Sequence, residues 1–187
     1  MAISNPDISN YKPFYIQVGN TCYDTKSQWG FIAKTNPYPA LPTPKDPYKN
    51  DWPDEHGDDE YVTHLYYESF EFDVQFYIRA TDVETIRTSL ADFFATIQNG
   101  EFKVYDSATG LGRRKVRYAG FTEERAAIMD KDFARCIFTI TFKVNDPVTF
   151  MTYYNGSIVE TRNGLVVVSP GEQSSTMVVV GYRQTLG

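Results

Sequence analysis

The sequence is poor in the residues that most often carry chemistry. Its 187 residues include two histidines, His56 and His64, and two cysteines, Cys22 and Cys136. Neither histidine has a cysteine at a spacing typical of a nucleophile–base pair. The sequence also lacks metal-ligand spacings, calcium-loop patterns, nucleophile elbows and phosphate-binding glycine loops. We therefore predict a protein that is not an enzyme and has no cofactor and no metal site.

Long apolar runs are missing as well. No segment approaches the roughly 18 apolar residues that a membrane helix needs. The polar residues 1–11 contain neither the basic nor the apolar region of a secretory signal. Cys136 lies in a strand pattern, where a buried structural thiol is expected, and nothing requires a bridge to Cys22. These absences predict no membrane association and synthesis in a reducing cytoplasm.

Positive charge is scarce relative to negative charge. The chain has 18 Lys and Arg against 24 Asp and Glu, which gives a net charge of −6. Residues 51–60 hold six carboxyl groups and no Lys or Arg, so the whole imbalance lies in this one segment. A general nucleic-acid binder would need a basic surface. Aromatic residues make up 16% of the chain, which argues against intrinsic disorder.

Proline is concentrated in the same part of the chain. Six of the ten prolines lie between Pro37 and Pro53. Because proline fixes φ and has no amide donor, we expect an extended arm or loop over residues 36–60 and neither a helix nor a central strand. Two interpretations stay open: an arm that contacts a neighbouring chain, and a mobile surface loop. For the first, the candidate contact residues are Tyr38, Tyr48, Trp52, Asp54, Asp58 and Asp59.

Two periodic segments follow the proline-rich part. Apolar residues alternate with polar ones over 70–78, which predicts a strand with one buried face; its parity continues back to Val62. A helical stripe then predicts an amphipathic helix over 82–98, with Thr81 and Glu84 as its capping box. The stripe consists of Ile86, Leu90, Phe93, Phe94 and Ile97.

The rest of the chain has the pattern of short β segments. Residues 134–144 alternate strongly and end at Asn145-Asp146-Pro147, which predicts a second long strand. Asn163-Gly164 is typical of a type I′ hairpin turn. We expect further strands at 14–18, 29–34, 101–105 and 113–121, a polar stretch with a helical turn at 122–133, and three strands in the tail, the last at 175–183. The fold class is α+β, mostly β: an antiparallel sandwich or distorted barrel with one packed amphipathic helix.

A compact basic cluster consists of Arg113, Arg114, Lys115 and Arg117. Three interpretations apply: contact with phosphate or nucleic acid, solvated charge on a strand, and a surface complementary to the acidic residues 51–60, within or between subunits. We favour the third, because charge complementarity sets register and partner choice. Together with the six arm residues named above, these four residues are the candidate oligomer interface.

The order of elements is more specific than any single motif. A strand ending in Phe-Tyr-Ile-Arg-Ala (76–80) leads to a helix with Leu90 and Phe93-Phe94. Gly-Glu-Phe-Lys-Val-Tyr (100–105), Arg-Tyr-Ala-Gly-Phe (117–121) and the alternating strand that runs into Asp-Pro at 146–147 follow. This order, over roughly residues 65–150, resembles the N-terminal domain of phage distal tail proteins, the hub component of long non-contractile tails.

The resemblance implies a structural virion protein of the phage tail. It implies a homo-oligomer, a hexameric ring, that contacts tube and tail-tip proteins, with DNA passing through its lumen without specific binding. It also implies assembly in the bacterial host cytoplasm. Residues 1–150 would be the tail-tube-like β domain with an insertion at 36–60, and residues 151–187 a C-terminal β extension too short for a carbohydrate-binding-like domain. A tube or terminator subunit, or a small ligand-binding domain or enzyme, remains the alternative.

Overall fold

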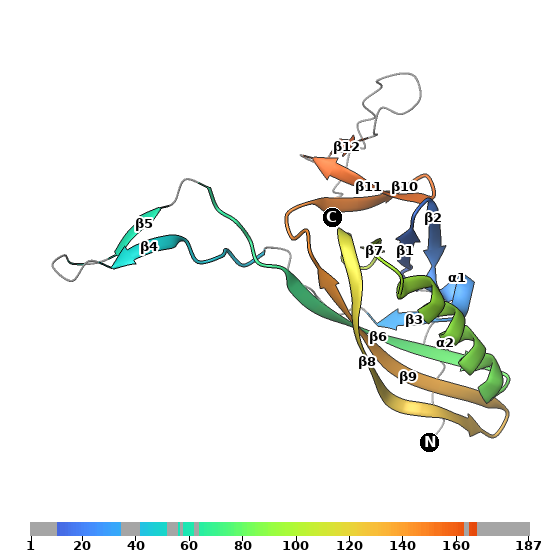
Figure 1. The fold of residues 1–187 in the computed structure, drawn as a ribbon. Helices are drawn as coiled ribbons and strands as arrows, with labels where there is room; N and C mark the ends of the chain where they lie inside the picture. Colours follow the sequence, from blue (N-terminus) through green and yellow to red (C-terminus); the bar gives the residue numbers. More distant parts are fainter. Residues whose placement is uncertain are drawn as a thin grey trace, which may run out of the picture.

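The computed structural model describes residues 11–34, 42–51, 56, 58–61, 64–162 and 165–167. In this part of the chain two helices accompany two antiparallel sheets, one of ten strands and one of two (Figure 1). The elements are β1 Phe14–Val18, β2 Thr21–Asp24, α1 Thr25–Trp29, β3 Ile32–Lys34, β4 Tyr48–Asp51, β5 Asp58–Tyr61, β6 Phe70–Ala80, α2 Val83–Ile97, β7 Phe102–Asp106, β8 Leu111–Asp130, β9 Phe133–Val144, β10 Phe150–Tyr154, β11 Ser157–Arg162 and β12 Leu165–Val167.

The main sheet has two branches that share β8, a strand of 20 residues. One branch runs β12-β11-β10-β8-β7-β1-β2, and the other runs from β8 through β9 and β6 to β3. The sheet is not closed into a barrel, and the predicted α+β, mostly β class is confirmed. β11 packs against β1, β2 and β7, so the C-terminal strands form a second layer over the start of the chain (Figure 1).

Helix α2 covers one face of the β6–β9–β8 branch. Its buried Phe93 meets Phe31 and Phe76 with ring centroids 5.2 and 5.9 Å apart. Phe138 of β9 joins the same cluster, 5.1 Å from Phe31. Edge-to-face aromatic pairs of this kind add to the stabilisation from buried apolar area. The aromatic residues that the sequence supplies in excess therefore build the layer between helix and sheet.

The two strongest sequence patterns are confirmed as β6 and β9, which pair antiparallel along their whole length from Phe70 and Val144 to Ala80 and Ala134. β6 starts at Phe70, so the parity that continues back toward Val62 does not extend the strand. The helix is also confirmed, but its cap is Asp82. The Asp82 carboxylate accepts a 2.7 Å hydrogen bond from the Thr85 amide, and Thr81 donates its hydroxyl to the same side chain.

Two other predictions are corrected. Residues 122–130 continue β8 and contain no helical turn, because they pair with β9 through two register shifts, each typical of a β-bulge. The run 29–34 is divided between the end of α1 and the three residues of β3. Gly30 ends α1 in the left-handed region at φ 78°, with its amide donating to the Lys26 carbonyl. The predicted strand at 175–183 lies outside the described residues.

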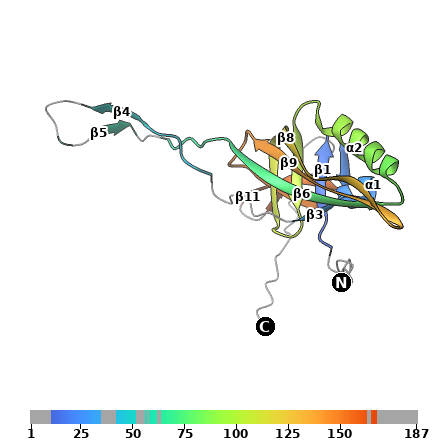
Figure 2. The ribbon, with the colours of Figure 1, turned by 90° about the horizontal axis from the view of Figure 1, so that it is seen from below.

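An arm projects from the main sheet and carries the second sheet at its far end (Figures 1 and 2). The arm consists of two antiparallel legs, the described residues of 42–51 and of 58–68. At its root the Lys45 amide donates to the Tyr66 carbonyl, and the Glu68 amide to the Thr43 carbonyl, both at 2.8 Å. At its end β4 and β5 form a two-stranded ribbon, and no helix occurs in these described residues.

Candidate assembly interface

The arm exposes large side chains to solvent. Tyr48 is 75% exposed, Tyr66 70% and Leu65 58%. A two-stranded ribbon is marginally stable on its own in water, because it has no third layer on which to bury a face. Exposed apolar groups gathered on such an element are typical of a contact surface. The arm therefore has the composition of a segment that is stabilised by packing against a partner.

The ribbon at the end of the arm concentrates acidic residues at paired positions. In the β4–β5 register Asp51 pairs with Asp58, Asn50 with Asp59, and Lys49 with the exposed Glu60. We call β4 and β5 together the acidic ribbon. Its composition suits a cationic partner.

The structure describes part of the candidate arm contacts. Tyr48 begins β4, and Asp58 and Asp59 begin β5. Tyr38, Trp52 and Asp54 lie outside the described residues.

The basic cluster is divided by a bulge in β8. Phe102 of β7 pairs with Val116, but Val104 pairs with Arg113, so β8 has one more residue than β7 between these pairs. Lys115 takes a left-handed φ of 50° there. As a result both Arg113 and Val116 point inward, although they are an odd number of residues apart, and Arg113 is fully buried. An unbroken alternation would have placed them on opposite faces.

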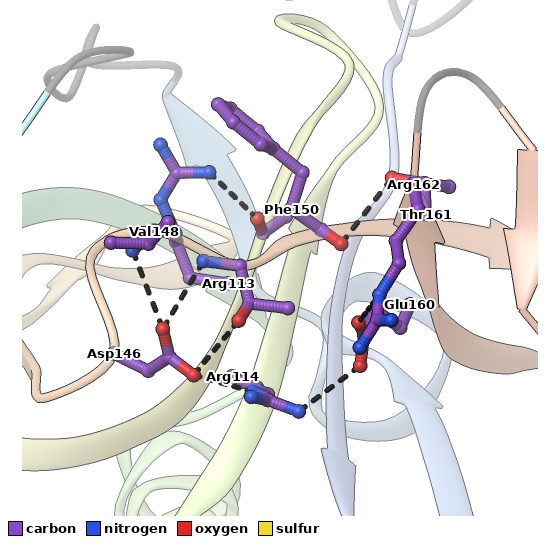
Figure 3. Close-up of polar contacts among 10 residues, drawn as sticks. Arg113, Arg114, Asp146, Val148, Phe150, Glu160, Thr161 and Arg162 are labelled. Atoms are coloured by element: carbon purple, nitrogen blue, oxygen red, sulfur yellow. Dashed lines mark hydrogen bonds and ion pairs between the residues drawn. The ribbon is translucent and has the colours of Figure 1, made fainter.

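Arg113 is held inside its own chain. Its guanidinium lies 4.4 Å from the centroid of the Phe150 ring and donates from Nη1 to the Gly112 carbonyl at 3.2 Å (Figure 3). Stacking on an aromatic face and a hydrogen bond to a carbonyl are typical of a buried guanidinium. Arg113 thus packs β10 against β8.

Arg114 connects three segments through ion pairs. Its Nε lies 2.5 Å from Asp146 Oδ2, after β9, and its Nη1 lies 3.1 Å from Glu160 Oε2 on β11 (Figure 3). Burial alone would raise the pKa of Asp146, but the hydrogen bonds from Arg114 and from the Thr149 amide and hydroxyl lower it below its ordinary value. Of the predicted basic cluster, Lys115 and Arg117 remain exposed.

The face of β6–β9–β8 opposite α2 is polar and open to solvent; we call it the open face. Its cross-strand row nearest the arm contains Glu71, Lys143 and Arg117, with 3.8 Å between Glu71 and Lys143. In the next row the Thr141 hydroxyl donates to Asp73 at 2.6 Å. Acidic side chains on β6 therefore lie beside the root of the arm.

At the end of the open face farthest from the arm, arginines occupy the polar positions of the strands. Arg79 pairs with Arg135, and Arg135 pairs with Ile128 on the other side. One row nearer the arm, Arg125 lies across from Ile137. We call Arg79, Arg125 and Arg135 the arginine end. The sequence pattern does not single it out, although Arg79 and Arg135 occupy polar positions of the two alternating strands.

Apolar groups surround the arginine end. The Arg79 guanidinium lies 3.7 Å from the centroid of the Phe133 ring, and Ile128 is 43% exposed. Tyr77, opposite Ile137, is half-buried. Arginine and aromatic residues with apolar neighbours are the composition enriched in protein–protein interfaces. Hydrogen bonds from Gln75 and Thr139 to Glu124 separate this region from the middle of the face.

Other kinds of site find little support among the described residues. Within that part of the chain, no group of three or more His, Cys, Asp and Glu is placed to hold a metal ion. None of its helices has the length and apolarity needed to cross a membrane. Both cysteines are free, and burial raises the thiol pKa of each to about 11. A thiol of that pKa stays protonated near neutral pH and is a poor nucleophile.

No protein-family model and no curated protein matches the chain. Among solved structures it is similar to the Dit protein of phage SPP1, which is described as a paradigm of the hub adsorption apparatus in phages that infect Gram-positive bacteria. The two are 14% identical, with a TM-score of 0.48. The match covers 75% of this chain and 52% of the Dit chain, so it spans about half of that protein.

Proposed function

We propose that this protein is a structural, ring-forming component of a phage tail, a hub protein between the tail tube and the tail-tip adsorption apparatus. It works by self-association and by contact with tube and tail-tip proteins, and it resides in the virion after assembly in the bacterial cytoplasm. The proposed oligomer is a hexameric ring. DNA passes through its lumen and is not bound there.

The arm is the observation that carries this proposal. It leaves the sheet as a two-stranded projection, and Tyr48, Leu65 and Tyr66 on it are more than half exposed (Figure 2). A projection of this kind buries too little of its own surface to be stable alone, and a neighbouring subunit supplies the missing contact. A closed ring needs two different, complementary surfaces on each subunit, and an arm reaching a neighbour is one half of such a contact.

The order of elements supports the same function. The sequence resemblance to distal tail proteins rests on a strand, a helix, a short strand, a hairpin and a final alternating strand that runs into Asp-Pro. The structure contains this succession as β6, α2, β7, β8 and β9, and Asp146-Pro147 follows β9 after Asn145. The acidic ribbon adds the negative charge that repels phosphates wherever it faces a DNA path.

The test is the oligomeric state of the full chain and of a variant without the arm. We expect the wild-type protein to form a closed ring, measured by sedimentation velocity and seen by negative-stain electron microscopy. Replacing residues 46–64 by a short Gly-Ser linker should leave a folded monomer, since the main sheet keeps all its pairs. Circular dichroism and thermal unfolding check the folding of the variant.

Two results would count against this proposal. A wild-type chain that stays monomeric at high concentration and does not join a reconstituted tail tip would refute the ring. Intact rings in the armless variant would show that the arm is a surface loop. A stacked filament in the micrographs would instead identify a tube subunit.

A further inference from the structure

We propose that the acidic ribbon of one copy docks on the arginine end of a second copy, so that subunits associate head to tail along the direction of β6. This inference deepens the proposed function, on which it rests, by naming the surface that receives the arm. It follows from where the two surfaces lie, from their charge, and from the apolar groups that accompany each.

The two surfaces lie at opposite ends of the molecule. The arm enters β6 at Phe70, and the arginine end begins at Arg79, close to the last residue of the strand. At about 3.3 Å per residue these positions are roughly 30 Å apart. The arm projects away from the sheet (Figure 1), so its ribbon lies farther still from the arginine end of its own chain. The contact therefore needs a second copy.

The two ends of the open face differ in charge. Beside the arm the charges are mixed: Glu71 and Asp73 are exposed, and Glu71 lies 3.8 Å from Lys143 in the row that also contains Arg117. At the other end Arg79 and Arg125 are both exposed. The arginine end is therefore complementary in charge to an acidic ribbon.

The charged pairs of the two surfaces are matched. Asp51 and Asp58 hold directly paired positions in the ribbon, and Arg79 and Arg135 hold directly paired positions in the sheet. Guanidiniums bind carboxylates through paired hydrogen bonds, so docking the ribbon on the arginine end would set opposite charges against one another.

Apolar groups lie beside the charges on both surfaces. Tyr48 begins the ribbon and is 75% exposed, and Ile128 borders the arginines and is 43% exposed. Phe133 already stacks against Arg79 and presents a half-buried ring at the same end. A tyrosine anchor beside an arginine–aromatic cluster has the composition of an interface hot spot.

The exposed pair Lys115 and Arg117 is the competing cationic surface. Arg117 lies at the arm end of the open face, in the row where Lys143 already contacts Glu71. This acidic neighbour lowers the attraction for a second carboxylate. The neighbours on the sheet also differ: Arg117 lies across from Lys143, whereas at the arginine end Arg125 lies across from the half-buried Ile137 and Arg135 across from the exposed Ile128. The pair supplies a control of equal charge.

The experiment uses charge reversal in the full-length chain. The arginine variant carries Arg79→Glu and Arg125→Glu, and the ribbon variant carries Asp58→Lys and Asp59→Lys. Each should shift self-association to roughly tenfold or more higher protein concentration in sedimentation velocity, because each sets like charges against one another. An equimolar mixture of the two should recover assembly, since every contact in an alternating ring is then between opposite charges.

The control variant carries Lys115→Glu and Arg117→Glu and changes the net charge by the same amount as the arginine variant. It should assemble at the wild-type concentration. Thermal unfolding checks that all three variants remain folded. Recovery in the mixture is the decisive readout, because two chains that had each merely lost their fold would not restore one another.

The outcomes separate this inference from the proposed function. A wild-type chain that never assembles refutes the proposed function, and the docking with it. Wild-type rings together with a fully assembling arginine variant, or a control variant that fails instead, refute the docking alone. Failure of the mixture to recover also refutes it. DNA binding by the wild-type chain, measured by fluorescence anisotropy and lost in an arginine variant that still assembles, would assign the arginine end to nucleic acid.

Discussion

Gly112 is the position at which the C-terminal strands join the main sheet, and substituting it by alanine should release them. β10 pairs with β8 at one register position, Met151 with Gly112. A Cβ atom at residue 112 would lie 2.6 Å from the Met151 carbonyl oxygen and 2.9 Å from Met151 Cβ. Both atoms belong to or directly join the β10 backbone. The clash can therefore be relieved only by moving the strand, because a change of side-chain rotamer would leave these atoms in place.

The magnitude follows from overpacking at a buried contact. Forcing an extra methyl group into a well-packed site costs about 1–3 kcal/mol. In a chain of this size that corresponds to a fall in Tm of about 2–12 °C. The matched control is Gly120→Ala on the same strand, where the new Cβ would lie 3.5 Å from Thr141 Cβ, an ordinary contact. That substitution should be neutral or stabilise by about 0.4–1 kcal/mol through the unfolded state.

The assay is denaturant unfolding of both variants beside hydrogen exchange of the β10 and β11 amides. Gly112→Ala should lower the free energy of unfolding and speed exchange at Met151 and Ile158, while α2 and β9 keep their protection. Equal stability of the Gly112→Ala and Gly120→Ala proteins would refute the reasoning, because it would mean that β10 does not approach β8 as closely as the pairing requires. If hydrogen exchange instead became faster evenly over the whole sheet, the idea that Gly112 attaches β10 locally would be refuted.

Three further results are expected. Phe93→Ala, at the centre of the layer between helix and sheet, should destabilise the fold by about 3–5 kcal/mol in denaturant unfolding, and a loss below 1 kcal/mol would contradict the packing described. The lowered pKa of Asp146 contributes stability that is present above its unfolded value of about 3.8 and is lost as pH falls through the lower folded value. Asp146→Asn should therefore flatten the pH dependence of unfolding below about pH 4, and an unchanged slope would contradict the role of Arg114. Cys22 and Cys136 should resist thiol reagents at pH 7 in the native protein and react fully in denaturant; rapid native labelling would contradict their raised pKa values.

The strands β6 and β9 were predictable because their two faces differ strongly. One face packs against α2 and is apolar at every second residue, while the other is the open face and is polar. The helix was predictable for the same reason, at the helical period. Its cap was assigned one residue too early, since Thr81 and Glu84 fit a capping box but the Asp82 carboxylate reaches the Thr85 amide.

The second half of β8 could not be predicted from its own residues. Residues 122–130 are exposed or half-buried wherever the burial of their side chains is described, and two register shifts change their parity, so no alternation marks them as a strand. Their conformation follows from pairing with β9, a tertiary effect that local pattern does not contain. Helix α1 was missed because five residues are too few to establish a helical period.

The candidate interface shows the same division between local and tertiary information. The proline content predicted an extended arm, since proline restricts the backbone at each position independently of context. The basic cluster looked continuous in sequence, yet the bulge at Lys115 sends Arg113 into the core and leaves Arg117 outside. Conversely, Arg79 and Arg125 are 46 positions apart and come together only through their common neighbours on β9.

The position of the arm allows two arrangements for the proposed docking. The arm leaves the Phe70 end of β6 and points away from the sheet, while the arginine end lies at the opposite extremity (Figure 2). Two antiparallel copies would dock reciprocally, as a two-fold dimer, and a particle of two subunits in sedimentation velocity would identify that arrangement. In the proposed ring each arm instead reaches the arginine end of the next copy. Such a contact is heterologous, and heterologous contacts close into a ring when the rotation between subunits is right and otherwise continue as a filament. Because the arm is joined to the sheet by a narrow two-stranded root, the geometry of that root sets this rotation, and changes at Lys45 or Tyr66 should alter ring size before they abolish assembly.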